Sequence, residues 1–156
     1  MAYVGKLRST CIADCPFSIA QAYAEEYLAE AERGGPAGMM FAGPFKRRVA
    51  VEFGRRVDAT DPGRVHEELT VRWTARSRLI PDFSGNLRMR IVGTQTRLIL
   101  KGEYRPPGGI FGVIFDDVIG KRIAHATAAS LLARIAAALA EREAAWRRRV
   151  EDRLTS

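Results

Sequence analysis

Residues 102–127, GEYRPPGGIFGVIFDDVIGKRIAHAT, combine several glycines, a Gly-Lys pair, two adjacent aspartates and a histidine within this 156-residue chain. The glycines and the Gly-Lys pair could form a phosphate-binding loop. A Walker loop needs a glycine five residues before its Gly-Lys and a serine or threonine after it, but Phe115 and Arg122 occupy those positions. A dinucleotide fingerprint counted back from Gly112 fails as well, because its first glycine is replaced by Pro107. We interpret the segment as a hinge, where prolines end a strand and glycines let the chain turn into a helix.

Acids and bases around this segment could transfer protons. Asp116 and Asp117 are adjacent, but acids at a helix start gain about 0.3–1 kcal/mol from the helix dipole without any reaction. His125 falls on the polar margin of the predicted helix, which favours a surface role. No serine, histidine or acid stands at a spacing that would complete a catalytic triad. We therefore assign no catalytic residue; an enzyme would have to use Glu67, His125 or Tyr104.

Basic residues give the chain a net charge of +7, with 21 arginines and four lysines against 18 acids. Such an excess can serve nucleic acid, an anionic membrane surface or an acidic ligand, or can simply solvate a surface. Arginines on one face of the predicted strands are mixed with Glu52, Glu68 and Glu103, without aromatic residues for base stacking. We do not expect a nucleic-acid partner. The C-terminal WRRRVEDRL is interpreted as a solvated helix end, which leaves peripheral contact with a membrane or an acidic partner open.

The two cysteines, Cys11 and Cys15, are too few for a disulfide framework, and the chain lacks four regularly spaced zinc ligands. We expect free thiols, no metal site and no cofactor. No run approaches the roughly 18 consecutive apolar residues of a membrane span, and the first residues do not resemble a signal peptide. The expectation is one cytoplasmic domain, residues 1–156, as a monomer or homodimer.

Hydrophobic periodicity predicts the secondary structure. Pro16 suits a first helical position and is followed by apolar residues at intervals of four. Later segments alternate apolar and polar residues, as strands do, and residues 37–45 and the stretch IPDFSGN are predicted to be loops. The fold class is therefore α+β. We expect a strand at 3–12, a helix at 16–33, an antiparallel meander at 47–104 and a C-terminal helix at 111–152.

Successive side chains of a strand point to opposite faces, so residues two apart share a face, a relation we call strand parity. It places the large apolar side chains of the meander on one face. Folding each hairpin about its turn pairs Ile91 with Leu98, Met89 with Leu100, and Trp73 with Met89, and a slip by one residue would break this agreement. A ligand cavity between this face and the last helix is expected to be lined by Val51, Phe53, Leu69, Val71, Trp73, Met89, Ile91, Leu98, Leu100, Tyr104, Phe115, Ile119 and Ile123.

The C-terminal helix is expected to cover that face with one apolar stripe. Its members recur at helical spacing, whereas Arg134, Glu141 and Arg148 fall elsewhere. The stripe consists of Ala124, Ala128, Leu131, Leu132, Ile135, Leu139 and Trp146.

Arg55 and Glu67 share the inner face by parity, and a fold about Asp61 places them opposite each other. One interpretation is a cross-strand ion pair worth about 0.2–1 kcal/mol. The other is a polar anchor at the cavity mouth that orients a ligand carboxylate or hydroxyl.

The order of elements and the segment 102–127 resemble the SRPBCC or START-like (helix-grip) superfamily, and within it the polyketide cyclase/dehydrase group. The resemblance is carried by Gly102-Glu103-Tyr104 in the final strand, the prolines and glycines after it, and Gly120-Lys121-Arg122 in the last helix. The stretch DCPFSIAQAY is also similar to the first helix of that superfamily. The resemblance covers essentially the whole chain.

This resemblance implies a curved antiparallel sheet wrapped around a long C-terminal helix. It also implies a hydrophobic or amphipathic small-molecule ligand of the lipid, isoprenoid or aromatic polyketide class. The alternative is a cyclase or dehydratase that uses the same cavity, and a second alternative is an interaction module with a basic surface.

Overall fold

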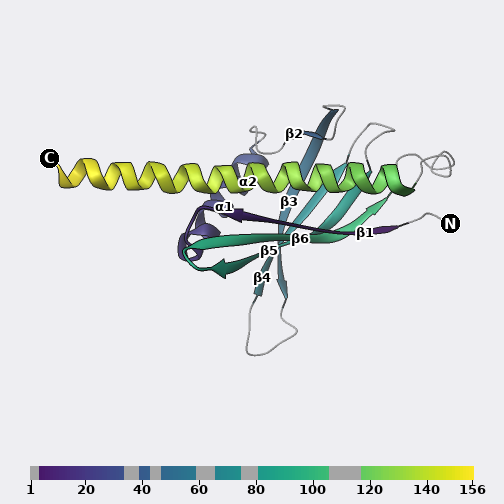
Figure 1. Cartoon of the computed structure of the whole chain (residues 1–156), viewed down its shortest axis with the longest axis horizontal. Coiled ribbons are helices and arrows are strands. Elements are labelled where there is room, and N and C mark those ends of the chain that lie inside the picture. The colour runs from purple at the N-terminus through teal and green to yellow at the C-terminus, as the bar shows by residue number, and fades with distance from the viewer. Residues whose placement is uncertain (1–3, 34–38, 43–46, 59–65, 75–80, 106–116) are drawn as a thin grey trace.

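The computed structural model describes residues 4–33, 39–42, 47–58, 66–74, 81–105 and 117–156. Six antiparallel strands form one sheet in the order β1-β6-β5-β4-β3-β2. The long helix α2 runs along one face of this sheet with α1 beside it, which is the α+β helix-grip architecture (Figure 1). The elements are β1 (Gly5–Ala13), α1 (Phe17–Glu32), β2 (Met39–Ala42), β3 (Arg47–Asp58), β4 (His66–Thr74), β5 (Asp82–Val92), β6 (Gln95–Arg105) and α2 (Asp117–Leu154).

The bounds of most elements lie within a few residues of those predicted, which is the usual uncertainty at frayed ends. Helix α1 begins directly after Pro16, whose carbonyl accepts hydrogen bonds from the amides of Ile19 (3.2 Å) and Ala20 (3.0 Å). The predicted loop at 37–45 is wrong in part, because Met39–Ala42 form β2 and pair with β3. This strand is only four residues long and shows no alternation, so periodicity could not reveal it. The predicted helical residues 111–116 lie outside the described residues.

The two faces of the sheet are as predicted, but the predicted strand pairings are wrong. Met89 pairs with Leu98 rather than Leu100, and Ile91 with Thr96 rather than Leu98. The β5–β6 turn is centred on Gly93-Thr94, one residue earlier than expected, because Gly93 adopts the positive φ (58°) that tight hairpin turns favour. Moving a turn centre by one residue shifts the pairing by two, which preserves the face.

The pairing of β4 with β5 differs more from the prediction. Trp73 pairs with Phe83 rather than Met89, and Val71 pairs with Gly85. The reason is that β5 already begins at Asp82, inside the predicted loop IPDFSGN. The glycine in this stretch is a strand residue and not a turn signal.

Gly85 and Gly102 form a cross-strand pair that the ring of Phe83 covers. A Cβ built on either glycine would lie only 2.6 Å from the Phe83 Cζ, and equally close to the Cα of the other glycine. Trp73 then stacks on Phe83 with ring centroids 4.2 Å apart, and its Nε1 donates a 3.0 Å hydrogen bond to the Pro81 carbonyl. Because glycine has no side chain, the aromatic rings can lie flat on the sheet at these two positions.

We expect Gly102→Ala to lower the free energy of unfolding by about 1–3 kcal/mol, because the added methyl group overpacks this site. Urea unfolding followed by circular dichroism measures the change. Gly93→Asn is the matched control: no atom lies within 4 Å of the Cβ it would add, and asparagine tolerates positive φ. Equal stability of Gly102→Ala and the unmodified protein would contradict the described packing.

Helix α2 supplies the other side of the core. The predicted stripe is confirmed except for Trp146, which is 50% exposed because the last turns of α2 extend beyond the sheet (Figure 1). An 18-residue window within Gly120–Leu154 has a mean hydropathy of 1.5, apolar enough for a membrane span, but half of that window is buried inside the fold. This is the pattern of a core helix. The buried members of the predicted stripe are Ala124, Ala128, Leu131, Leu132, Ile135 and Leu139, and Ile123 is buried as well.

Candidate functional site

Most of the residues predicted to line a cavity belong to the packed core, and we call this group the wall. Phe53 and Met89 are half-buried at its margin. The side chains of Phe115 and Ile119 lie outside the described residues, so their place in a cavity stays a prediction. The remaining wall residues are at most 8% exposed: Val51, Leu69, Val71, Trp73, Leu98, Leu100, Tyr104 and Ile123.

Ile91 does not belong to the covered wall, which corrects the prediction. Its side chain is 66% exposed although it has the parity of the inner face. It pairs with Thr96 one step before the turn at Gly93, so it lies at the tip of the β5–β6 hairpin. Parity identifies the face of a residue, but not whether a helix reaches that end of the strand.

The predicted pair of Arg55 and Glu67 is also corrected. Arg55 pairs with Leu69, and Glu67 pairs with Val57, so the two residues are offset by one pleat on the same face. The two residues are therefore diagonal neighbours in the sheet and not directly opposite each other. The side chains lie outside the described residues, and their role as a polar anchor stays a prediction.

The candidate acid–base residues lie on separate elements. Tyr104 in β6 is 4% exposed, and its ring covers Gly5, which leaves no room for a Cβ there. His125 lies half-buried on α2, and the side chain of Glu67 is not described. This arrangement gives Tyr104 a packing role against β1.

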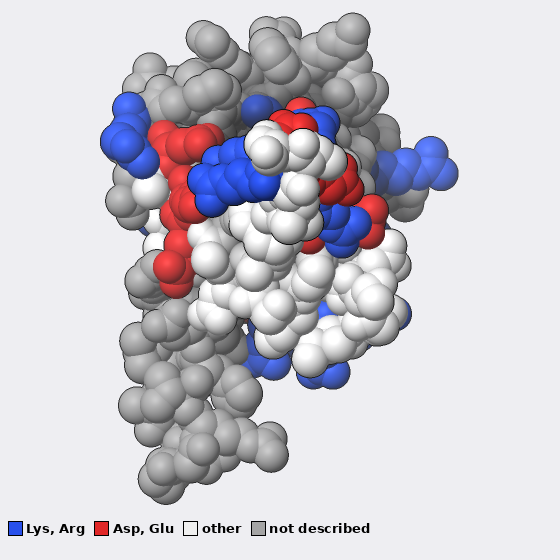
Figure 2. Space-filling view, turned by 90° about the vertical axis from the view of Figure 1, so that its left-hand side faces the viewer, with Lys and Arg blue, Asp and Glu red and all other residues white. Residues whose placement is uncertain are grey.

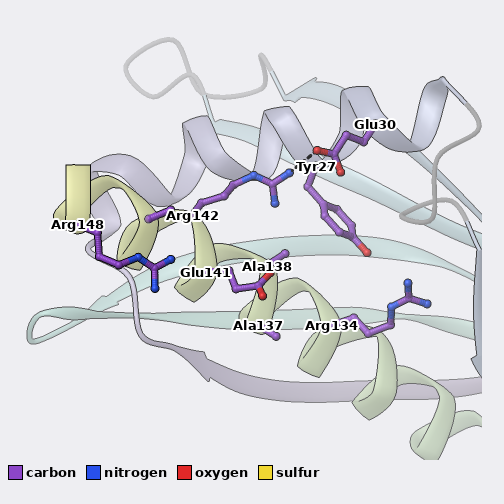
Figure 3. A pocket seen from close by; sticks show the side chains of 9 residues that line it. Tyr27, Glu30, Arg134, Ala137, Ala138, Glu141, Arg142 and Arg148 are labelled. Atoms are coloured by element: carbon purple, nitrogen blue, oxygen red, sulfur yellow. Dashed lines mark hydrogen bonds and ion pairs between the residues drawn. The ribbon is translucent and has the colours of Figure 1, made fainter. Parts of the chain in front are cut away.

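A pocket of about 690 Å³ lies between α1 and α2 (Figure 3). None of its residues was predicted as a site residue. The alanine side chains of α2 are too small to fill the space between the helices, and charged side chains surround it. The lining comprises Tyr27, Glu30, Arg134, Ala137, Ala138, Glu141, Arg142, Ala145 and Arg148.

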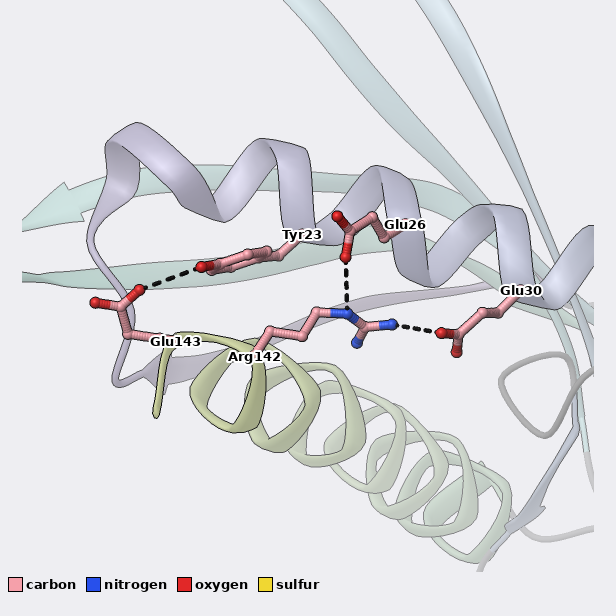
Figure 4. A network of polar contacts seen from close by, with 5 residues as sticks. All are labelled: Tyr23, Glu26, Glu30, Arg142 and Glu143. Atoms are coloured by element: carbon pink, nitrogen blue, oxygen red, sulfur yellow. Dashed lines mark hydrogen bonds and ion pairs between the residues drawn. The ribbon is translucent and has the colours of Figure 1, made fainter. Parts of the chain in front are cut away.

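Arg142 joins the two helices along one side of this pocket (Figure 4). Its Nε donates to Glu26 Oε2 (3.3 Å) and its Nη2 donates to Glu30 Oε1 (2.8 Å). The guanidinium carbon also lies 6.0 Å from the centroid of the Tyr27 ring. Both glutamates are more than half exposed, so each pair contributes at most about 1 kcal/mol, but together they fix α1 beside α2.

Tyr27 forms the inner wall of the pocket. It is 7% exposed, and its ring meets that of Phe53 edge-to-face with centroids 5.9 Å apart. Its hydroxyl is buried and has no hydrogen-bond partner among the described residues. Burial raises the pKa of Tyr27, against the lowering effect of Arg134 and Arg142, so the hydroxyl is protonated near neutral pH. Tyr27 thus connects the pocket to the predicted wall through Phe53.

A second polar cluster lies where α1 begins. Glu143 on α2 is 4% exposed, accepts a hydrogen bond from the Tyr23 hydroxyl (3.4 Å) and accepts another from Arg147 Nε (2.9 Å). Thr96 Oγ1 donates to the Cys15 carbonyl (2.7 Å), which ties β6 to the same corner. These contacts satisfy one another and indicate a structural cluster.

Cys15 in this corner is not a nucleophile near neutral pH. Burial, with the nearby charges of Glu143 and Asp14, raises its pKa to about 11. Cys11 is half-buried, and both thiols are free. At pH 8 we expect Ellman's reagent to modify Cys11 and to spare Cys15 until the protein is unfolded in urea. Rapid modification of two thiols per native chain would contradict this environment.

Charges of both signs share the surface around the end of α2. Figure 2 shows Lys and Arg side chains interspersed with Asp and Glu there, with an uncharged surface beneath them. The described arginines of the outer sheet face, among them Arg72, Arg88 and Arg97, are exposed and share that face with Glu52 and Glu103. Mixed charge of this kind fits solvation better than a track for phosphates.

No protein-family model and no curated protein matches this chain. Among solved structures, the chain is similar to TTHA0849 from Thermus thermophilus (14% identity, TM-score 0.47, 86% of this chain and 97% of the other). It is also similar to the di-domain ARO/CYC StfQ from the steffimycin biosynthetic pathway, with 17% identity and a TM-score of 0.48 over 91% of this chain and 52% of the other. A further similar structure is the Zhui aromatase/cyclase from Streptomyces sp. R1128, with 13% identity and a TM-score of 0.39 over 89% of this chain and 90% of the other. The chain thus spans about half of StfQ. At these identities and TM-scores the similarity does not extend to ligand or activity, and the helix-grip assignment rests on the sheet order and helix placement of this chain.

Proposed function

We propose that this protein binds a hydrophobic or amphipathic small molecule of the lipid, isoprenoid or aromatic polyketide class. The proposed binding space is the open pocket between α1 and α2, rather than the space between the sheet and α2 that the sequence predicted. The observation that carries the proposal is the pocket of about 690 Å³ beside Tyr27, whose ring contacts Phe53 of the apolar wall. Ligand pockets usually measure about 300–1,000 Å³ and combine an apolar lining with a few polar groups.

The distribution of side-chain size along α2 supports this location. Leu131, Leu132 and Leu139 fill the core and are at most 1% exposed. The side of α2 that faces the pocket carries Ala137 and Ala138 instead of leucines. Small side chains there leave room that leucines would occupy, so a ligand can enter without displacing the core.

Apolar burial supplies the binding energy in this proposal. At about 25 cal/mol per Å², burying about 200 Å² of apolar ligand surface contributes about 5 kcal/mol before the costs of association are subtracted. The polar lining then determines the orientation of the ligand. An enzyme of the cyclase or dehydratase type would need an acid or base at this space, and the described pocket offers Glu141 and Tyr27 rather than a poised pair.

Native mass spectrometry of the protein purified from cells tests the proposal without choosing a ligand beforehand. We expect a fraction of the protein to carry a small molecule that organic extraction releases. Fluorescence titration of a Trp146→Phe variant, in which Trp73 is the remaining tryptophan, then ranks lipid, isoprenoid and aromatic libraries. A protein that carries nothing and binds none of the three classes would refute the proposal.

A further inference from the structure

The hydroxyl of Tyr27 is a buried hydrogen-bond donor that the described part of the chain leaves unused. The oxygen is inaccessible to water, and no acceptor lies within hydrogen-bonding distance among the described residues. Buried polar groups in proteins nearly always have a partner, because leaving one without a partner is costly. By contrast Tyr23, one turn earlier on the same helix, donates to Glu143. The unused donor of Tyr27 therefore points to an acceptor that the described residues do not provide.

The electrostatic surroundings of this hydroxyl favour a negatively charged acceptor. Figure 3 shows the Tyr27 side chain directed from α1 toward α2, with the guanidinium of Arg134 close to its hydroxyl end. Burial raises the pKa of the Tyr27 phenol, and Arg134 and Arg142 each lower it by more than Glu30 raises it. Arg148 contributes a further positive charge to the lining. An anionic group at this place would gain both a hydrogen bond and charge attraction.

The pocket also explains why such a ligand would be amphipathic. The floor beside Tyr27 consists of Ala137, Ala138 and Ala145, which offer apolar surface but no hydrogen bonds. Glu30 is engaged by Arg142 at 2.8 Å, so Glu141 is the remaining carboxylate of the lining. A cationic ligand would meet three guanidinium groups against the two carboxylates of the lining.

We propose that this pocket holds the anionic oxygen group, a carboxylate or a phosphate, of an amphipathic small molecule whose apolar part lies along the alanines of α2. The Tyr27 oxygen has no accessible surface in the ligand-free structure, so its side chain would shift toward the pocket on binding. Oη would then donate the hydrogen bond that fixes the anionic group, and Arg134 supplies the neighbouring charge. This inference rests on the proposed function and deepens it by naming the end group of the ligand and the residue that recognises it.

The test compares three probes of equal chain length below their micellar concentrations: dodecanoate, dodecyl phosphate and dodecanol. Isothermal titration calorimetry measures each affinity. We expect at least one of the two anions to bind about tenfold more tightly than dodecanol, as one charge-assisted hydrogen bond provides. The ratio of the dodecanoate and dodecyl phosphate affinities identifies which anionic group fits.

Tyr27→Phe removes only the hydroxyl. We expect it to lower the affinity of the preferred anion about tenfold, to reduce the preference over dodecanol, and to leave the melting temperature of the ligand-free protein unchanged or raised. Tyr23→Phe is the matched control, since its hydroxyl has a protein acceptor in Glu143. This control is expected to lower the melting temperature and to leave the anion affinity unchanged.

Two results would overturn the inference. Equal affinity for dodecanol and both anions would do so while leaving the proposed hydrophobic binding intact. Tyr27→Phe with unchanged anion affinity and a melting temperature lowered as in Tyr23→Phe would show that the Tyr27 hydroxyl is a structural group. Absence of binding by all three probes would reject the inference and also remove alkyl chains from the proposed function.

Discussion

Filling the pocket from α2 is expected to abolish most ligand binding. Ala138 lines the pocket and is half-buried, and Ala138→Phe would place a ring in the space beside Tyr27. If the ring displaces about 60 Å² of buried apolar ligand surface, the affinity falls about tenfold, and a larger displacement costs more. Fluorescence titration with the best ligand of the library measures the loss.

Two companion variants separate this effect from damage to the fold. Ala137→Trp enters the same pocket from an exposed position, so it blocks the ligand without overpacking the core. Ala133→Phe adds the same ring to an exposed position of α2 outside the pocket lining. We expect Ala137→Trp to weaken binding and Ala133→Phe to leave it unchanged. Equal affinity of all three variants would show that the ligand lies elsewhere.

The two tryptophans are expected to differ sharply in their contribution to stability. Trp73 is 1% exposed, stacks on Phe83 and donates a hydrogen bond to Pro81. Trp73→Ala should lower the free energy of unfolding by about 3–5 kcal/mol, because it opens a large cavity beneath α2 and removes the stacking partner. Trp146 is 50% exposed on the last turns of α2, and Trp146→Ala should change stability by no more than about 0.5 kcal/mol.

Urea denaturation of the two single variants measures this difference directly. The comparison also tests the orientation of the sheet, since Trp73 is buried only if the inner face meets α2. Similar small losses for both variants would mean that β4 does not lie beneath the helix. Similar large losses would mean that the end of α2 packs against a surface not seen in the monomer.

The sequence predicted the faces of the sheet because alternation has a period of two and both faces differ in polarity. It could not predict the register, because every even shift keeps the same face. Gly93 decided the β5–β6 pairing through its positive φ, and Phe83 over Gly85 decided where β5 begins. A glycine that signals a turn and a glycine that lets a ring approach look alike in the sequence.

The candidate site was less predictable than the fold. The pocket depends on which way α1 faces α2, and Arg142 with Glu26 sets this through contacts more than 100 residues apart. Tyr27 looked like an ordinary core tyrosine, since its spacing from Tyr23 only indicates a helical face. Whether its hydroxyl finds an acceptor is a property of the packed structure. Trp146 was assigned to the stripe because periodicity does not show where the sheet ends.

A crystal structure of the protein with the tightest ligand from the titrations tests the central claim most directly. We predict electron density for the ligand between α1 and α2, in contact with Ala138 and bordered by the ring of Tyr27. Density on the outer face of the sheet, or an α1–α2 junction filled by protein side chains while the ligand lies elsewhere, would contradict the account.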